Sequence, residues 1–120
     1  MPSKRVTRIL LAAIDSIGLI GSVQLDLATM PNARHRAEVM KLMVHRRARH
    51  QGVGQVLLRA LEDEARAAGR QLLVLDTRVG DAAERLYAKM GYARAGIIPR
   101  YARSSSGTLD GTVFMYRWLE

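Results

Sequence analysis

The feature that most limits how this chain can fold is the stretch of residues 38–76. It begins with a short apolar run, EVMKLMVH at 38–45, in which Lys41 is the only interior charge. A basic loop follows, and then apolar residues recur at three- and four-residue spacing from Val53 to Ala68, which predicts an amphipathic helix ending at Gly69. The run QLLVLD at 71–76 predicts a buried parallel strand. Strand, helix and strand in this order predict a right-handed crossover.

The residues before this unit predict an antiparallel hairpin. RILLAAI at 8–14 reads as one strand and LIGSVQLDLA at 19–28 as a second, with turn residues at 15–18 between them. A chain of 120 residues suits one domain with one core, here residues 1–120. We therefore expect a mixed α/β sheet rather than an all-parallel one.

The residues after the crossover predict a second helix and two more strands. Asp81 and Glu84 have the spacing of a capping box, and Gly91 ends the helix they begin. Residues 92–98 read as a weak strand closed by Pro99, and 104–111 as a polar loop. Residues 112–119, TVFMYRWL, are β-branched and aromatic and predict the last strand.

The charge of the chain indicates an anionic partner. Lys and Arg number 19 against 11 Asp and Glu, a net charge of +8. Residues 34–49 concentrate the basic side chains, with Glu38 as their single acid. A solvated basic surface is the plainer interpretation, but this stretch leads directly into glycines at a helix start, which favours phosphate binding.

The absence of cysteine excludes several classes of site. Disulfides, thiolate metal centres and an acyl-cysteine intermediate all need it, and a cysteine-free chain suits a reducing cytoplasm. No HExxH or comparable cluster predicts a metal, and His35, His45 and His50 are isolated. No apolar run reaches the length of a membrane span, so neither a metal nor a membrane is expected.

The motif with the clearest chemistry is Arg49-x-x-Gly52-x-Gly54. Glycines there let backbone N–H groups approach an anion, and the positive end of the helix dipole adds to the attraction. The pattern GxxxxGK[ST] of nucleotide triphosphatases and the dinucleotide pattern GxGxxG are both missing. The loop therefore predicts a pyrophosphate site of another kind.

At this point the sequence resembles the GNAT superfamily of acetyltransferases. Residues 49–54, RHQGVG, match its signature Q/R-x-x-G-x-G/A, and residues 83–92, AERLYAKMGY, match A-x-x-L-Y-x-K-x-G-F/Y. The segments LIGSVQLDLA, LLVLDT and GTVFMYRWL are most similar to small-molecule, tabtoxin-resistance-like members. Gly80 replaces the usual Asn of the second motif. The resemblance implies a GNAT-like acyl-CoA N-acyltransferase fold that lacks the first strand and the first two helices.

The resemblance also implies a site for acetyl-CoA between two strands that splay apart. Tyr87 matches the tyrosine that protonates the departing thiolate, although a core tyrosine fits the same pattern. Glu38 lies fourteen positions before Gly52, a spacing seen for a general-base glutamate, although a surface glutamate at a strand end fits equally. The implied cofactor-binding residues are the strand segment Leu42, Met43 and Val44 and the loop residues Arg46, Arg47, Arg49, His50, Gln51, Gly52, Val53, Gly54 and Gln55.

These expectations predict an N-acetyltransferase that moves acetyl from acetyl-CoA to a primary amine of a small molecule, by direct attack in a ternary complex. Two alternatives stay open: a basic nucleic-acid-binding domain, which the scarcity of aromatic residues disfavours, and a coenzyme-A-binding protein without turnover. We also expect a homodimer, because the final strand at 112–119 could pair with a second chain or cover its exposed sheet.

Overall fold

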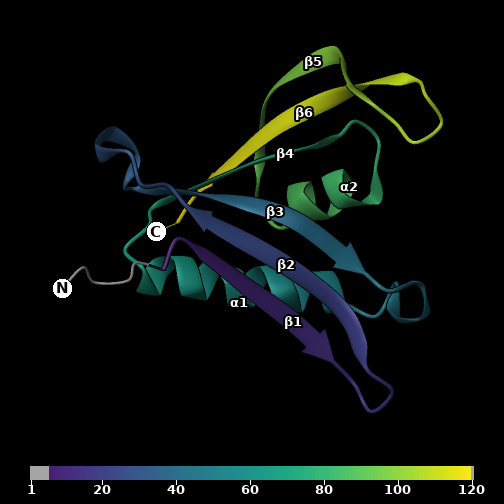
Figure 1. Cartoon of the computed structure of the whole chain (residues 1–120), viewed down its shortest axis with the longest axis horizontal. Helices are drawn as coiled ribbons and strands as arrows, with labels where there is room; N and C mark the ends of the chain where they lie inside the picture. The colour runs from purple at the N-terminus through teal and green to yellow at the C-terminus, as the bar shows by residue number, and fades with distance from the viewer. Residues whose placement is uncertain (1–5, 120) are drawn as a thin grey trace.

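A computed structural model describes residues 6–119 and shows a mixed α/β fold (Figure 1). Its six-stranded sheet has the order β1-β2-β3-β4-β6-β5. The predicted mixed sheet with two α-helices is confirmed. In chain order the elements are β1 (Arg8–Ile14), β2 (Leu19–Leu27), the 3-10 turn η1 (Pro31–Ala33), β3 (Arg36–Val44), the 3-10 turn η2 (Arg46–Ala48), α1 (Val53–Ala67), β4 (Leu72–Arg78), α2 (Ala82–Lys89), β5 (Ala93–Arg103) and β6 (Leu109–Trp118).

The crossover β3-α1-β4 is the centre of the fold, as its sequence pattern predicted. β3 and β4 are parallel, and the other paired strands run antiparallel. Gly69 has φ +75° after the last turn of α1, the left-handed conformation of a helix C-terminus. The chain then enters β4, whose Leu73 and Leu75 are buried.

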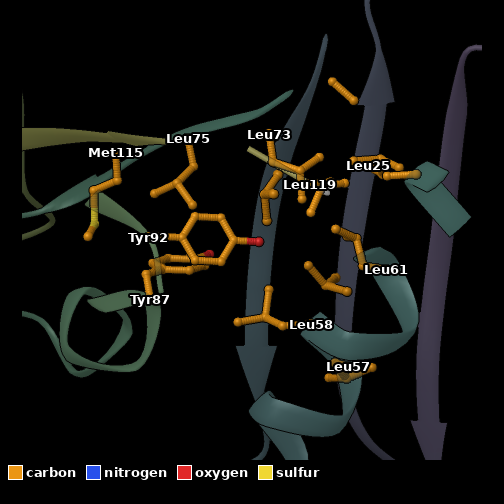
Figure 2. Close-up of a cluster of buried hydrophobic side chains, with 14 of the residues drawn as sticks. Leu25, Leu57, Leu58, Leu61, Leu73, Leu75, Tyr87, Tyr92, Met115 and Leu119 are labelled. Atoms are coloured by element: carbon orange, nitrogen blue, oxygen red, sulfur yellow. The ribbon is translucent and has the colours of Figure 1, made fainter. Parts of the chain in front are cut away.

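Both helices cover the same face of the sheet, and the core lies between them and the strands. α1 packs across β1, β2 and β3, while α2 lies against β4 (Figure 1). Figure 2 shows the resulting cluster, in which α1 contributes Leu57, Leu58 and Leu61 at one end and β6 contributes Met115, near Leu75 of β4, at the other. Within the described residues, no helix is long and apolar enough to cross a membrane.

A buried ion pair ties α1 to the C-terminal strands. Glu62 is only 4% exposed, and its Oε2 accepts hydrogen bonds from the Tyr92 hydroxyl at 3.0 Å and from Arg117 Nη1 at 2.7 Å. A buried carboxylate that loses its cation keeps its desolvation cost without the attraction that offsets it. The pair therefore matters more for stability than the exposed pairs on the surface.

We expect Arg117→Met to lower the free energy of unfolding by about 3 kcal/mol, because it leaves Glu62 charged and unpaired in the core. The matched control is Arg66→Met, which breaks the exposed α1 pair with Asp63 (3.4 Å) and should cost less than about 1 kcal/mol. Urea denaturation of the three proteins measures both changes. Equal small losses for the two variants would show that the buried pair contributes nothing beyond a surface pair.

Three sequence expectations in the C-terminal half are wrong. Asp81 precedes α2 without capping it through its side chain, and Glu84 instead accepts from the backbone N–H of Gly80 at 2.7 Å and from Arg94 Nε at 2.8 Å. β5 does not end at Pro99 but continues to Arg103. Proline is tolerated there because β5 is an edge strand whose register shifts between Ile98 and Ala102. β6 begins at Leu109, inside the expected loop.

The last strand is not free to pair with another chain. β6 lies between β4 and β5 and is hydrogen-bonded to both, so the edges of the sheet are β1 and β5. The expectation that residues 112–119 could extend the sheet of a partner is therefore wrong. What β6 does expose is its outward face, since Trp118 is 52% and Tyr116 37% exposed, while Met115 on the inward face is buried.

Candidate active site

β3 and β4 separate soon after they meet. Their parallel pairing spans only Arg36–Glu38 against Leu72–Val74. β3 then continues to Val44 and β4 to Arg78 without pairing with each other, and β4 stays paired to β6 along its whole length. The expected splay is confirmed, and Figure 1 shows the two strands diverging. This wedge leaves one edge of β3 with backbone groups that β4 does not bond.

A bulge turns β3 within the wedge. Lys41 has φ +53°, and the pairing of β3 with β2 shifts between Met40 and Met43. Before the bulge Val39 is buried against the helices; after it Leu42 packs against the core, and Met43 is 63% exposed. The predicted pantetheine-binding segment, Leu42 to Val44, thus follows a bulge that the sequence did not predict.

The glycine-containing loop reaches α1 at the wide end of this wedge. Gly52, the residue before α1, has φ +79°, and His50 before it has φ +64°. No side chain caps the helix, and its first turn contains no acid. The first helical bond runs from the Val56 N–H to the Gly52 carbonyl, so the N–H groups of Val53, Gly54 and Gln55 have no acceptor within the helix. This helix N-terminus is suited to an anion.

The two glycines of the motif have different roles. A Cβ on Gly52 would meet nothing within 4 Å, so glycine is needed there for its backbone conformation. A Cβ on Gly54 would lie 2.6 Å from Leu86 Cδ2 of α2. Gly54 is buried and lets the start of α1 approach α2, which the motif alone did not reveal.

Arg47 is braced by a residue far away in the sequence. Its guanidinium donates to both carboxylate oxygens of Asp15, at 2.6 and 3.0 Å. The hydrogen bond from Arg47 holds the pKa of Asp15 well below its usual range, with the Ile17 N–H adding to the effect. Part of the charge of Arg47 is therefore used to hold the β1–β2 turn. Arg46, Arg49 and Gln51 are exposed, and Gln51 Nε2 donates to the Arg47 carbonyl at 3.3 Å.

Tyr87 lies in the core beside the wedge. It is 4% exposed and packs edge-on against Tyr92, with ring centroids 5.4 Å apart (Figure 2). Burial, with a smaller contribution from Asp76, raises the pKa of Tyr87 to about 12. Within residues 6–119 its hydroxyl has no hydrogen-bond partner, whereas that of Tyr92 is bound to Glu62. Both interpretations of Tyr87 fit this position: a core side chain, and a phenol that keeps its proton at neutral pH.

Glu38 is half-buried on the opposite face of the sheet, at the point where the wedge opens. In the sheet, Glu38 lies opposite Asp26 of β2 on one side and opposite Val74 of β4 on the other. Burial raises the pKa of Glu38, and the carboxylates of Asp76 and Asp26 raise it further, while Arg8 acts against them. A carboxylate with raised pKa is a better general base than an ordinary one.

Asp76 was not predicted as a site residue, although the run QLLVLD ends on it. It lies on β4 two positions after Val74, the partner of Glu38. An acid at the carboxyl end of a buried parallel strand is the signal that could have identified it, because ligands of parallel sheets bind at those ends. Within the described residues, no three His, Asp or Glu side chains are grouped to hold a metal ion.

The wedge, the uncapped helix and the basic loop together define a site for a ligand with an anionic end and an extended chain. The chain belongs to the acetyltransferase (GNAT) family, whose model matches residues 5–92. That match includes every residue predicted to bind a cofactor or to take part in catalysis.

Solved structures share the fold. A GNAT-family acetyltransferase from Streptococcus pneumoniae superposes with a TM-score of 0.86 at 24% identity, covering 94% of this chain and 68% of that one. The yncA protein of Salmonella typhimurium, solved with its cofactor acetyl-CoA, has a TM-score of 0.82 at 24% identity, covering 92% of this chain and 64% of that one. At these identities the likeness concerns the fold.

A curated relative matches over a shorter stretch. The IAA acetyltransferase of Azospirillum brasilense is 45% identical over 60 residues, which are 49% of this chain. The match spans only 39% of the relative's length.

Proposed function

We propose that the chain is an N-acetyltransferase that moves the acetyl group of acetyl-CoA to a primary amine of a small molecule, by direct attack in a ternary complex. The observation that carries the proposal is that the wedge between β3 and β4 opens toward the uncapped, glycine-containing start of α1. A phosphate group at the helix would leave the attached chain to run along β3 toward Glu38. The binding of acetyl-CoA by the fold neighbour yncA supports this choice of cofactor.

The residues at hand fit that cofactor. The three N–H groups at the start of α1 and the exposed Arg46 and Arg49 would hold its phosphates. Leu42 to Val44, on the strand edge that β4 does not bond, would hold the pantetheine amides. Acetyl-CoA supplies an activated thioester, which an amine can attack without a covalent enzyme intermediate, in keeping with the absence of cysteine.

Two proton transfers remain for the protein. A primary amine is protonated at neutral pH and must lose a proton to attack; Glu38, whose pKa is raised, would take that proton. The sulfur that leaves must gain a proton, and Tyr87, whose raised pKa keeps it protonated, would give it. The nitrogen–carbon bond forms and the carbon–sulfur bond breaks. The nitrogen then loses its second proton to solvent, which returns a proton to Tyr87, so that the net release is one proton.

A second candidate is binding of coenzyme A without turnover, which the burial of Tyr87 supports because a core tyrosine needs no catalytic role.

We further propose a cytoplasmic homodimer. Its interface would be the β1 end of the sheet face opposite the helices, where Leu10 is 63% exposed, so that the face around Glu38 and Asp76 stays open to the amine. Light scattering of the purified chain measures its oligomeric state.

The proposed function is tested by calorimetry of the purified chain with acetyl-CoA, followed by thiol release with a panel of small primary amines. We expect binding that weakens as salt is added, because exposed arginines meet phosphates, and thiol release that depends on the amine. Binding without amine-dependent release favours the second candidate. The absence of any binding at low salt contradicts both.

A further inference from the structure

We propose that Asp76 is a positioning residue of this reaction, whose carboxylate draws the protonated amine to Glu38 at the point where β3 and β4 begin to separate. The inference rests on the proposed function and adds a residue that neither family motif contains. Asp76 lies on β4, across the opening from the strand that carries Glu38. It was the register of the sheet, not the sequence pattern, that brought the two together.

The register places both carboxylates on the same face. Glu38 pairs with Val74, and Asp76 follows Val74 by two residues. Because every second side chain of a strand lies on the same face, Glu38 and Asp76 share one face of the sheet. Leu73 and Leu75, on either side of Val74, are buried under the helices. Glu38 and Asp76 therefore face away from α1 and α2, where an acceptor can approach without crossing the side on which α1 presents its phosphate-binding turn.

Asp76 is also unusual for an acid in so basic a chain. Seven acidic side chains of the described residues form ion pairs with arginine, but Asp76 and Glu38 are not among them. Two neighbouring carboxylates without a counter-ion repel each other. With 19 basic residues against 11 acidic ones, arginine partners are plentiful in this chain. The uncompensated pair suits a cationic ligand that arrives from outside.

Asp76 has no packing role to explain it. It is exposed, and within residues 6–119 its side chain makes no hydrogen bond. The charges that face Glu38 come from three strands: Asp76 of β4, Asp26 of β2 and Arg8 of β1, and Arg8 is itself paired with Asp26 at 3.7 Å. Because Arg8 partly neutralises Asp26, Asp76 is the less compensated neighbour.

This arrangement favours the proton transfer that the reaction needs. The ammonium group is attracted while Asp76 and Glu38 are both charged. When its proton passes from nitrogen to a carboxylate oxygen of Glu38, the repulsion between Glu38 and Asp76 is relieved. The pair therefore promotes both the arrival of the cation and its conversion to the neutral nucleophile.

The test is Asp76→Asn, which removes the charge and keeps the shape. We expect the KM for the amine to rise about fivefold, as for loss of one partly exposed ion pair, with acetyl-CoA affinity unchanged. The acid limb of the pH profile of kcat/KM should move to lower pH, because Glu38 loses a neighbouring negative charge. Carbon-13 NMR of labelled glutamate, with Glu38→Gln to assign the signal, should show the Glu38 carboxyl titrating at lower pH in the variant.

The matched control is Asp63→Asn, the same charge change on the exposed side of α1, which should alter neither the profile nor the Glu38 signal. Wild-type turnover with an unchanged KM, profile and Glu38 titration in Asp76→Asn overturns the proposal for Asp76 alone. Failure of the proposed function has a different signature, because the wild type itself then transfers no acetyl group.

Discussion

Replacing Tyr87 by phenylalanine should lower kcat about 100-fold and leave the affinity for acetyl-CoA nearly unchanged. The ring remains to fill its place in the core, so the structure loses only a hydroxyl. That hydroxyl has no protein partner within the described residues, and its pKa, raised to about 12, keeps it protonated at every pH at which the enzyme is assayed. The expected loss therefore measures proton donation to the departing thiolate rather than packing. Steady-state kinetics and calorimetry separate the two quantities.

Tyr92→Phe is the matched control for this experiment. The two tyrosines pack edge-on at 5.4 Å, but the Tyr92 hydroxyl is occupied by Glu62 at 3.0 Å. We expect Tyr92→Phe to lower the free energy of unfolding by about 2 kcal/mol, the net value of a hydrogen bond to a charged group, with little change in kcat. If Tyr87→Phe keeps full activity, Tyr87 is a core residue and the thiolate is protonated from solvent.

The second large effect is expected for Gly52→Asp, which should weaken acetyl-CoA binding at least 100-fold. A carboxylate at this position would lie at the start of α1, where we place the phosphates, and would repel them. A Cβ on Gly52 meets nothing within 4 Å, so the side chain itself disturbs no neighbour. The cost to the fold is the strain of a non-glycine residue at φ +79°, about 1 kcal/mol. Calorimetry with acetyl-CoA measures the change.

The other end of α1 offers a control with the same backbone. Gly69 has φ +75° and open space around its Cβ position, so Gly69→Asp carries a similar strain and the same charge at the C-terminal end of the helix. It should destabilise the protein at least as much as Gly52→Asp and leave acetyl-CoA binding intact. Equal losses of binding in both variants would mean that strain, and not the position of the charge, is responsible.

The parts of the fold that the sequence predicted are those encoded by neighbouring residues. The helix from Val53 and the strand ending near Asp76 follow from local periodicity, and Gly69 marks the helix end through its own conformation. The loop motif predicted the correct element junction for the same reason. A pattern shared by adjacent residues does not depend on how the rest of the chain folds.

What the sequence did not predict depends on distant partners. The residues near Lys41 do not predict its left-handed backbone conformation, because the bulge is set by the pairing of β3 with β2. Asp15 is a turn residue, as the sequence predicted, but its ion pair with Arg47 depends on the fold of the whole chain. Glu84 has capping-box spacing but bonds Gly80 and Arg94, since Arg94 on β5 competes for its second oxygen. The proximity of Asp76 to Glu38 likewise required the strand register.

The contact between Gly54 and Leu86 has a consequence for how the two halves of the site can vary. Gly54 belongs to the turn that begins α1, and Leu86 immediately precedes Tyr87 on α2. A larger residue at position 54 must displace the Leu86 side chain, which stands next to Tyr87 on α2. The two motifs are far apart along the chain, but they are in direct contact at Gly54 and Leu86, so the side-chain volumes at these two positions depend on each other. Side-chain volume gained at one of these two positions has to be given up at the other, so substitutions in either motif are constrained by the residue present in the other motif.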